Sequence, residues 1–203
     1  MTNVTALAAS TLSDVNTLAL AIKDWRNTDQ IRNGGRLTTV AISDSTIDAT
    51  ALATAIDNLD VINLGSTTDM TLASGATINV DAGEVTEMLL DETQNRLDIV
   101  DQNITVTNAI SAADAKLLAD TTTGVVTATI ATTARVSDLK LLPAESNAFT
   151  IVISAEDATS STAAEFNAIN SATSVAVDMT NVTALAASTL SDVNTLALAI
   201  KDW

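Results

Sequence analysis

The sequence contains no histidine and no cysteine. Without imidazole the chain has no Ser-His-Asp triad and no histidine ligands for zinc or iron. Without a thiol it has no disulfide, no redox-active cysteine and no cysteine metal site. Catalysis by carboxylates alone is then the case to consider, and the candidate pairs are Glu84 with Glu87 and Asp91 with Glu92. Because these residues lie on one predicted helix, we interpret them as its solvated face and predict that the protein is not an enzyme.

Aromatic and basic residues are also scarce. Aromatics make up 2% of the chain, whereas hydrophobic residues make up 47%, so we expect a core of Ala, Val, Ile and Leu in thin, regular layers. Nine Lys and Arg residues stand against 25 Asp and Glu residues, which gives a formal net charge of −16. This charge repels phosphate backbones and anionic membrane surfaces, so we predict no nucleic-acid partner. The sequence has no transmembrane run, and we predict no membrane insertion.

The two ends of the sequence are the same. Residues 1–25 read MTNVTALAASTLSDVNTLALAIKDW, and residues 179–203 repeat them letter for letter. The chain therefore reads as one long repeat unit, residues 1–178, followed by the first part of the next unit. We interpret it as a segment of a longer array, in which neighbouring repeats of the same chain are the expected partners.

A shorter pattern runs beneath this long repeat. A β-branched apolar run is followed by a turn and then by residues with helical periodicity. The predicted strand–helix pairs are 4–10 with 11–25, 38–43 with 48–59, 103–108 with 111–120, 125–130 with 134–142, and 149–154 with 161–170. A looser unit has predicted strands at 61–64, 70–72 and 77–80 and a predicted helix within 83–98.

Local signals support the predicted helices. Hydroxyl and acidic residues occur three positions apart at three predicted helix starts, the spacing of an N-terminal cap. Pro143 follows Leu142, where a helix is expected to stop. The capping pairs are Thr11 with Asp14, Ser111 with Asp114, and Thr162 with Glu165. In the first helix the predicted buried face consists of Leu12, Val15, Leu18, Ile22 and Trp25.

These elements predict a single α/β solenoid over residues 1–203, built from stacked strand-plus-helix units. Neighbouring strands stack about 4.8 Å apart, whereas packed helices need about 8–10 Å. One strand per helix forces a curved horseshoe, and two strands per helix give a straight rod. Because we predict more strands than helices, we expect a gently curved or nearly straight solenoid.

Four aspartates near the ends of predicted strands are candidate calcium ligands: Asp81, Asp98, Asp101 and Asp178. Acidic secreted repeats often bind calcium, but the glycine-rich nonapeptide and EF-hand patterns are both absent here. The alternative interpretation is that these aspartates cap turns and helices. We predict no cofactor and keep calcium as the alternative.

The predicted loop after Trp25 holds a third of the basic residues of the chain. Arg26, Arg32 and Arg36 surround the pair Gly34 and Gly35. One interpretation is a contact for an anion or a glycan. The other is a hinge between units, whose arginines pair with nearby acids.

The last part of the sequence, from SVAVDMTNVTALAASTLSDVNTLALAI, resembles degenerate repeats in very large surface proteins of marine cyanobacteria and other aquatic bacteria. The residues that carry the pattern V-x-V-D-x-x-x-V-T-x-L-x-x-x-x-x-x-D-V-N-T are Val175, Val177, Asp178, Val182, Thr183, Leu185, Asp192, Val193, Asn194 and Thr195. The first copy carries it at Val4, Thr5, Leu7, Asp14, Val15, Asn16 and Thr17. The likeness is good in the final third, fair at 103–173 and poor at 26–100.

The resemblance implies an extracellular or cell-surface location and a structural or adhesive role. We therefore expect a non-catalytic spacer or stalk of a giant surface protein that is able to stack end to end. Head-to-tail self-association is the expected interaction, because the last residues present the same unit as the first. The alternative is an adhesive module that binds a glycan or another cell surface.

Overall fold

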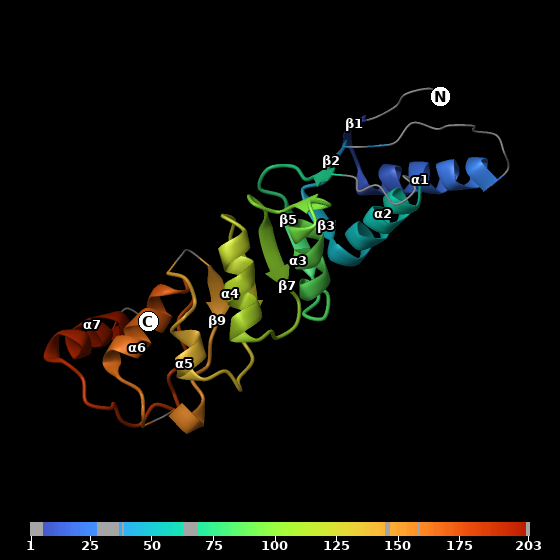
Figure 1. The fold of residues 1–203 in the computed structure, drawn as a ribbon. Coiled ribbons are helices and arrows are strands. Elements are labelled where there is room, and N and C mark those ends of the chain that lie inside the picture. Colours follow the sequence, from blue (N-terminus) through green and yellow to red (C-terminus); the bar gives the residue numbers. More distant parts are fainter. Residues whose placement is uncertain are drawn as a thin grey trace. The chain divides into compact units, whose positions relative to one another are not determined.

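A computed structural model describes residues 6–27, 37, 39–62, 69–144, 147–157 and 159–201. Within these residues the fold is mixed α/β, with seven α-helices and two parallel sheets and without a closed barrel. The chain divides into two compact units, residues 1–103 and 104–203, and Figure 1 shows the elements of each.

Unit 1 is built from parallel strands, and the paired residues of two neighbouring strands lie 27 to 33 positions apart in the sequence. One sheet has the order β1-β2-β4-β6, and β3 pairs with β5. Helix α1 packs on α2, and the two lie side by side in Figure 1. The elements are β1 (Ala6–Ser10), α1 (Leu12–Asn27), β2 (Thr39–Ile42), β3 (Thr46–Asp48), α2 (Ala49–Ile62), β4 (Asp69–Thr71), β5 (Thr77–Val80), α3 (Val85–Thr93) and β6 (Leu97–Asp98).

The register of unit 1 aligns apolar side chains in a column. Leu7 pairs with Val40, Val40 with Met70, and Met70 with Leu97. Val40, Met70 and Leu97 are buried, so each strand covers the apolar residue of the strand before it. Aliphatic side chains are large enough to fill such a column, because neighbouring strands lie only about 4.8 Å apart.

Unit 2 continues the parallel pattern, with three strands and four α-helices among its described residues. Strand β8 pairs with β7 on one side and with β9 on the other. The elements are β7 (Asn103–Val106), α4 (Ala112–Thr121), β8 (Val126–Thr129), α5 (Val136–Leu139), β9 (Ala148–Thr150), the 3₁₀-helix η1 (Ala155–Asp157), α6 (Ala163–Ser171) and α7 (Leu190–Lys201). The core of this unit includes Phe149 and Phe166, the two phenylalanines of the chain, both buried.

The predicted helix starts are confirmed. The Asp14 N–H donates to Thr11 Oγ1 at 3.1 Å, and the Asp114 N–H donates to Ser111 Oγ at 3.0 Å. Thr162 and Glu165 form a complete capping box, in which the Thr162 N–H also donates to Glu165. These caps satisfy backbone donors that the first helical turn leaves unpaired.

Other local predictions were wrong or partly wrong. The strand predicted at 61–64 is wrong for Val61 and Ile62, which end α2; the rest of that range lies outside the described residues. The alanine-rich α2 extends through this β-branched pair because helix propagation costs little once a helix has formed. The helix predicted at 134–142 is reduced to α5, and turn hydrogen bonds occupy the residues before Pro143.

The buried face predicted for the first helix is also only partly correct. Leu12 and Val15 are buried, together with Ala19, whereas Leu18 and Ile22 are half-buried. The predicted position of the Trp25 side chain lies outside what the structure describes.

The two identical segments occupy different environments. Residues 6–10 form β1, whereas the same letters at 184–188 form no strand. The side chain of Leu12 is 7% exposed, whereas Leu190, its counterpart, is 81% exposed. Since the letters are the same, the difference comes from packing: β2 and α2 cover the first copy.

This difference predicts unequal effects of the same substitution. Leu12→Ala removes a buried side chain and should lower the free energy of unfolding by about 2–3 kcal/mol. Leu190→Ala removes an exposed one and should change it by less than about 0.5 kcal/mol. Urea unfolding of both variants tests this, and equal losses would contradict the unequal packing.

Candidate functional site

The four aspartates proposed as calcium ligands accept hydrogen bonds within turns. Three of them accept from the backbone N–H two residues later: Asp81 from Gly83 at 2.9 Å, Asp98 from Val100 at 3.0 Å, and Asp178 from Thr180 at 2.9 Å. This local arrangement closes a turn at the end of a strand. The bond from Thr180 also holds the pKa of the Asp178 carboxyl below its usual value.

Asp101 has a related structural role. It accepts from the Ser74 hydroxyl at 2.6 Å and from the side-chain amide of the buried Gln102 at 2.5 Å. The Gln102 amide also donates to the Ala73 carbonyl at 3.2 Å, so Asp101 belongs to a link between two turns of unit 1. Within the described residues, no three acidic side chains come together as a metal-binding group.

The predicted basic loop cannot be placed. Arg32, Gly34, Gly35 and Arg36 lie outside the described residues. Only the backbone of Arg26 is described, near the end of α1. The glycan and hinge interpretations of this loop therefore stay predictions.

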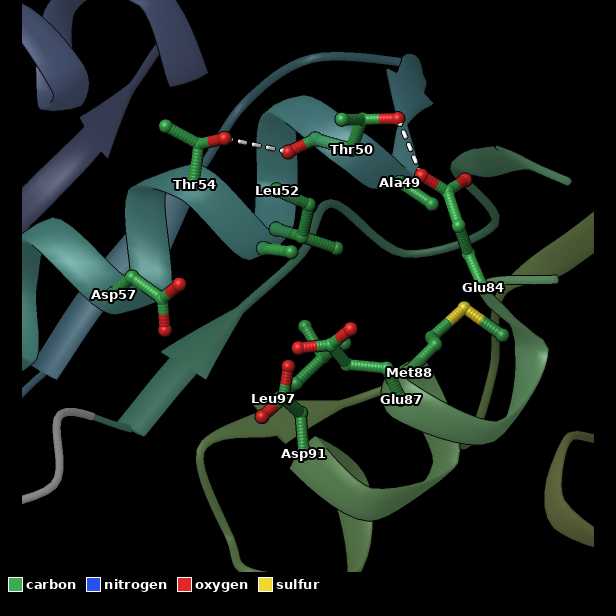
Figure 2. A pocket seen from close by; sticks show the side chains of 11 residues that line it. Ala49, Thr50, Leu52, Thr54, Asp57, Glu84, Glu87, Met88, Asp91 and Leu97 are labelled. Carbon is green, nitrogen blue, oxygen red and sulfur yellow. Dashed lines mark hydrogen bonds between the residues drawn. The ribbon is translucent and has the colours of Figure 1, made fainter.

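Both carboxylate pairs lie on or beside α3, as predicted, but the interpretation of them as a solvated face is wrong for Asp91, which is buried. Glu84, Glu87 and Asp91 border a groove in unit 1. The groove has a volume of about 210 Å³ and is lined by residues of α2, α3 and β6. Figure 2 shows its acidic side chains, Asp57 on α2 and Glu84, Glu87 and Asp91 from the α3 side. We call it the acidic groove.

The Glu84 carboxylate accepts hydrogen bonds from two separate segments of unit 1. The Thr50 hydroxyl on α2 donates to Glu84 Oε1 at 2.6 Å, a bond drawn in Figure 2. The Asp81 N–H donates to Glu84 Oε2 at 3.2 Å. Glu84 thereby connects the start of α3 with the start of α2. Glu87, in contrast, has no hydrogen bond or ion pair among the described residues.

Arg96 pairs with two acids of the acidic groove, Asp57 and Asp91, and with Asp60. Its guanidinium lies 2.9 Å from Asp91, 2.6 Å from Asp60 and 3.5 Å from Asp57. Burial raises the pKa of the Asp91 carboxyl, and the positive charge of Arg96 opposes that rise. Asp60 Oδ1 and Arg96 Nε are buried without a partner among the described residues, so the cluster is incompletely satisfied.

Glu92 makes a contact outside the Arg96 cluster. It accepts from the Ile99 N–H at 3.3 Å and so fastens the end of α3 to the residue after β6. Burial raises the pKa of its carboxyl, and the hydrogen bond from Ile99 opposes this. Glu84, Asp91 and Glu92 are each held by a structural contact.

The groove can attract a cation, but its chemistry is limited. The chain offers no imidazole or thiol to act beside these carboxylates. Sequence reasoning missed the role of Arg96, because its partners come from two helices. A usable signal was the spacing of Asp57 and Asp60, which places both on one face of a helix.

The Arg96 cluster predicts a pH-dependent loss of stability. Arg96→Gln leaves the buried Asp91 carboxylate unpaired and should lower the free energy of unfolding near neutral pH by about 3 kcal/mol. Removing the positive charge raises the Asp91 pKa further, so protonation on acidification relieves the penalty. The difference from the unchanged protein should therefore shrink as the pH falls toward the ordinary carboxyl value of 3.8.

Urea unfolding at several pH values measures this effect, and Arg135→Gln is the control. Arg135 pairs with Glu156, but both side chains are largely exposed, at 46% and 73%. The control should change the stability by less than about 0.5 kcal/mol. A pH-independent loss for Arg96→Gln would show that the unpaired Asp91 charge is not its cause.

Comparison with known proteins gives no family assignment. No protein-family model, no curated protein and no solved structure matches the chain. None of the described helices combines the length and apolar character needed to cross a bilayer.

Proposed function

We propose that the chain is a non-catalytic structural repeat, a spacer or stalk within a giant cell-surface or extracellular protein. In this proposal the parallel strands and helices are coils of a gently curved or nearly straight α/β solenoid that is able to stack end to end. A coil here means one strand-bearing segment with the helix that follows it.

The sequence separation between residues in contact is the observation that supports the proposal. Many side-chain hydrogen bonds of the described residues join elements far apart in the sequence, with separations that include 21 positions for Val126 with Asn147 and 42 for Asn58 with Asn16. Strand partners show similar separations, such as Ile104 with Val126. Each coil thus contacts the coil before it and the coil after it, as in repeat proteins whose energy is a sum of nearest-neighbour interfaces.

A recurring cap connects successive coils. In three places a polar side chain of the following coil accepts from the N–H of the first residue of a helix. The pairs are Leu12 with Asp44 at 2.6 Å, Val136 with Asp157 at 3.1 Å, and Ala163 with Ser188 at 3.0 Å. A repeated interface of this kind favours a passive spacer, because the same contact serves at each step along the array.

The surface location rests on the resemblance to giant bacterial surface proteins and on the acidic composition. A net charge of −16 keeps a long array soluble and limits nonspecific attachment to anionic surfaces.

Pulling on the two ends of a single molecule tests the spacer proposal. If neighbouring coils hold each other, the chain should lengthen in several small steps. Each step should release one coil, roughly 70–110 Å of extended chain at about 3.4 Å per residue. A single all-or-none event that releases the whole chain would contradict a solenoid of independently stacked coils.

A control identifies which interface each step reports. Asn147 is buried, and its side chain accepts from the Val126 N–H at 2.9 Å, so Asn147→Ala leaves that donor unpaired. This variant should lower the force of the unit 2 steps alone. Lys116→Ala removes an exposed ion pair with Asp120 within a single helix, α4, and should leave all forces unchanged.

A further inference from the structure

Two ion pairs join neighbouring helices, and their carboxylates have opposite surroundings. In unit 1, Arg96 connects Asp60 on α2 with Asp91 on α3. In unit 2, Lys140 at the end of α5 pairs with Glu165 on α6. When the fold favours the charged form of a carboxylate, acidification removes stability, and when it favours the neutral form, acidification adds stability. The surroundings of each carboxylate therefore set the direction of its pH response.

Asp91 is buried beside a surplus of negative charge. It is 5% exposed, and burial disfavours the charged form of a carboxyl group. Its partner Arg96, at 2.9 Å, is shared with two carboxylates of α2, Asp60 at 2.6 Å and Asp57 at 3.5 Å. Glu87 lies four residues earlier on α3, a spacing at which like charges repel. The charged groups that face Asp91 are thus one guanidinium and three carboxylates.

Protonation of Asp91 relieves this crowding at little cost to Arg96, because Asp57 and Asp60 remain as partners of the guanidinium. Burial, as the largest cause, holds the pKa of the Asp91 carboxyl above its ordinary value of 3.8. With a raised pKa, the folded chain binds the proton more readily than the unfolded chain. The folded chain therefore gains stability as the pH falls through the raised pKa toward 3.8.

Glu165 in unit 2 has contacts that favour its charged form. One carboxylate oxygen accepts from Lys140 Nζ at 2.8 Å, and the other accepts from the Thr162 N–H at 2.9 Å and the Thr162 hydroxyl at 3.1 Å. Lys140 is the charged group that faces it; Asp192, on the adjacent α7, accepts from the Thr189 hydroxyl. The bond from Lys140, followed by those from Thr162, holds the pKa of the Glu165 carboxyl below 4.5. This stability is present above pH 4.5 and is lost as the pH falls through the lowered pKa.

We propose that acidification tightens the side-chain contact between α2 and α3 in unit 1 and loosens the contact between α5 and α6 in unit 2. The two units then respond to pH in opposite directions, although both contacts are ion pairs between neighbouring helices. The inference goes beyond the spacer proposal and does not rest on it, because it needs only the contacts within each unit. The fold thereby contains a pH-sensitive device that shifts stability from unit 2 to unit 1 as the surroundings become acidic.

Amide hydrogen exchange by NMR reads each helix separately, and variants that imitate protonation test the proposal at neutral pH. The reporters are the Gln94 N–H, bonded to a carbonyl of α3, and the Phe166 N–H, bonded to the Thr162 carbonyl at the start of α6. Relative to the intrinsic rates, Asp91→Asn should slow exchange at Gln94 about threefold or more, and Glu165→Gln should speed exchange at Phe166 about threefold or more. The control Glu156→Gln changes a carboxylate that is 73% exposed and should leave both reporters unchanged.

A pH series on the unchanged chain gives a second readout that does not depend on how the variants fold. From about pH 6.5 to about pH 3.5, protection should rise at Gln94 and fall at Phe166. The rise should shrink in Asp91→Asn without vanishing, because burial also raises the pKa of the Glu92 carboxyl on α3. The fall should shrink in Glu165→Gln. The proposal is wrong if both reporters change in the same direction with pH, or if Asp91→Asn speeds exchange at Gln94, since the pair with Arg96 would then outweigh burial.

Discussion

Parallel pairing of each strand with a strand about one coil later is the interaction on which the rest of the structure depends. In unit 1 it stacks Leu7, Val40, Met70 and Leu97 at corresponding positions. Such a column needs side chains of moderate size, because neighbouring strands lie only about 4.8 Å apart. This explains how a chain with only 2% aromatic residues still buries an aliphatic core in unit 1. It also explains why long-range hydrogen bonds connect residues of neighbouring coils.

Polar residues have a consistent role around this core. Asp81, Asp98 and Asp178 close turns, and side chains such as Asp44 and Asp157 cap a helix of the preceding coil. Many carboxylates are therefore used by the backbone, which accounts for much of the acidic composition without a ligand. Arg96 is different, because it gathers three carboxylates from two helices of unit 1.

The sequence predicted features whose cause is local and missed those whose cause is tertiary. The caps at Thr11, Ser111 and Thr162 were predictable because both partners lie within one helical turn. The strand predicted at Val61 and Ile62 failed because the same apolar pair also suits the end of an established helix. The Arg96 cluster needed the packing of α2 against the residues after α3, which no local pattern specifies. The unequal burial of Leu12 and Leu190 had no sequence signal at all, since the two segments are identical.

The central claim is that contact with the next coil, rather than local sequence, sets the structure and stability of each segment. Amide hydrogen exchange by NMR tests it directly, at a concentration where the chain is monomeric. The helix bonds from Val15 to Thr11 and from Val193 to Thr189 are nearly the same length, 3.0 and 3.1 Å, and the intrinsic exchange rates of identical sequences are equal. We predict that the amides of α1 from Val15 to Ala19 exchange more slowly than those of α7 from Val193 to Ala197. Equal protection in the two helices would contradict the account.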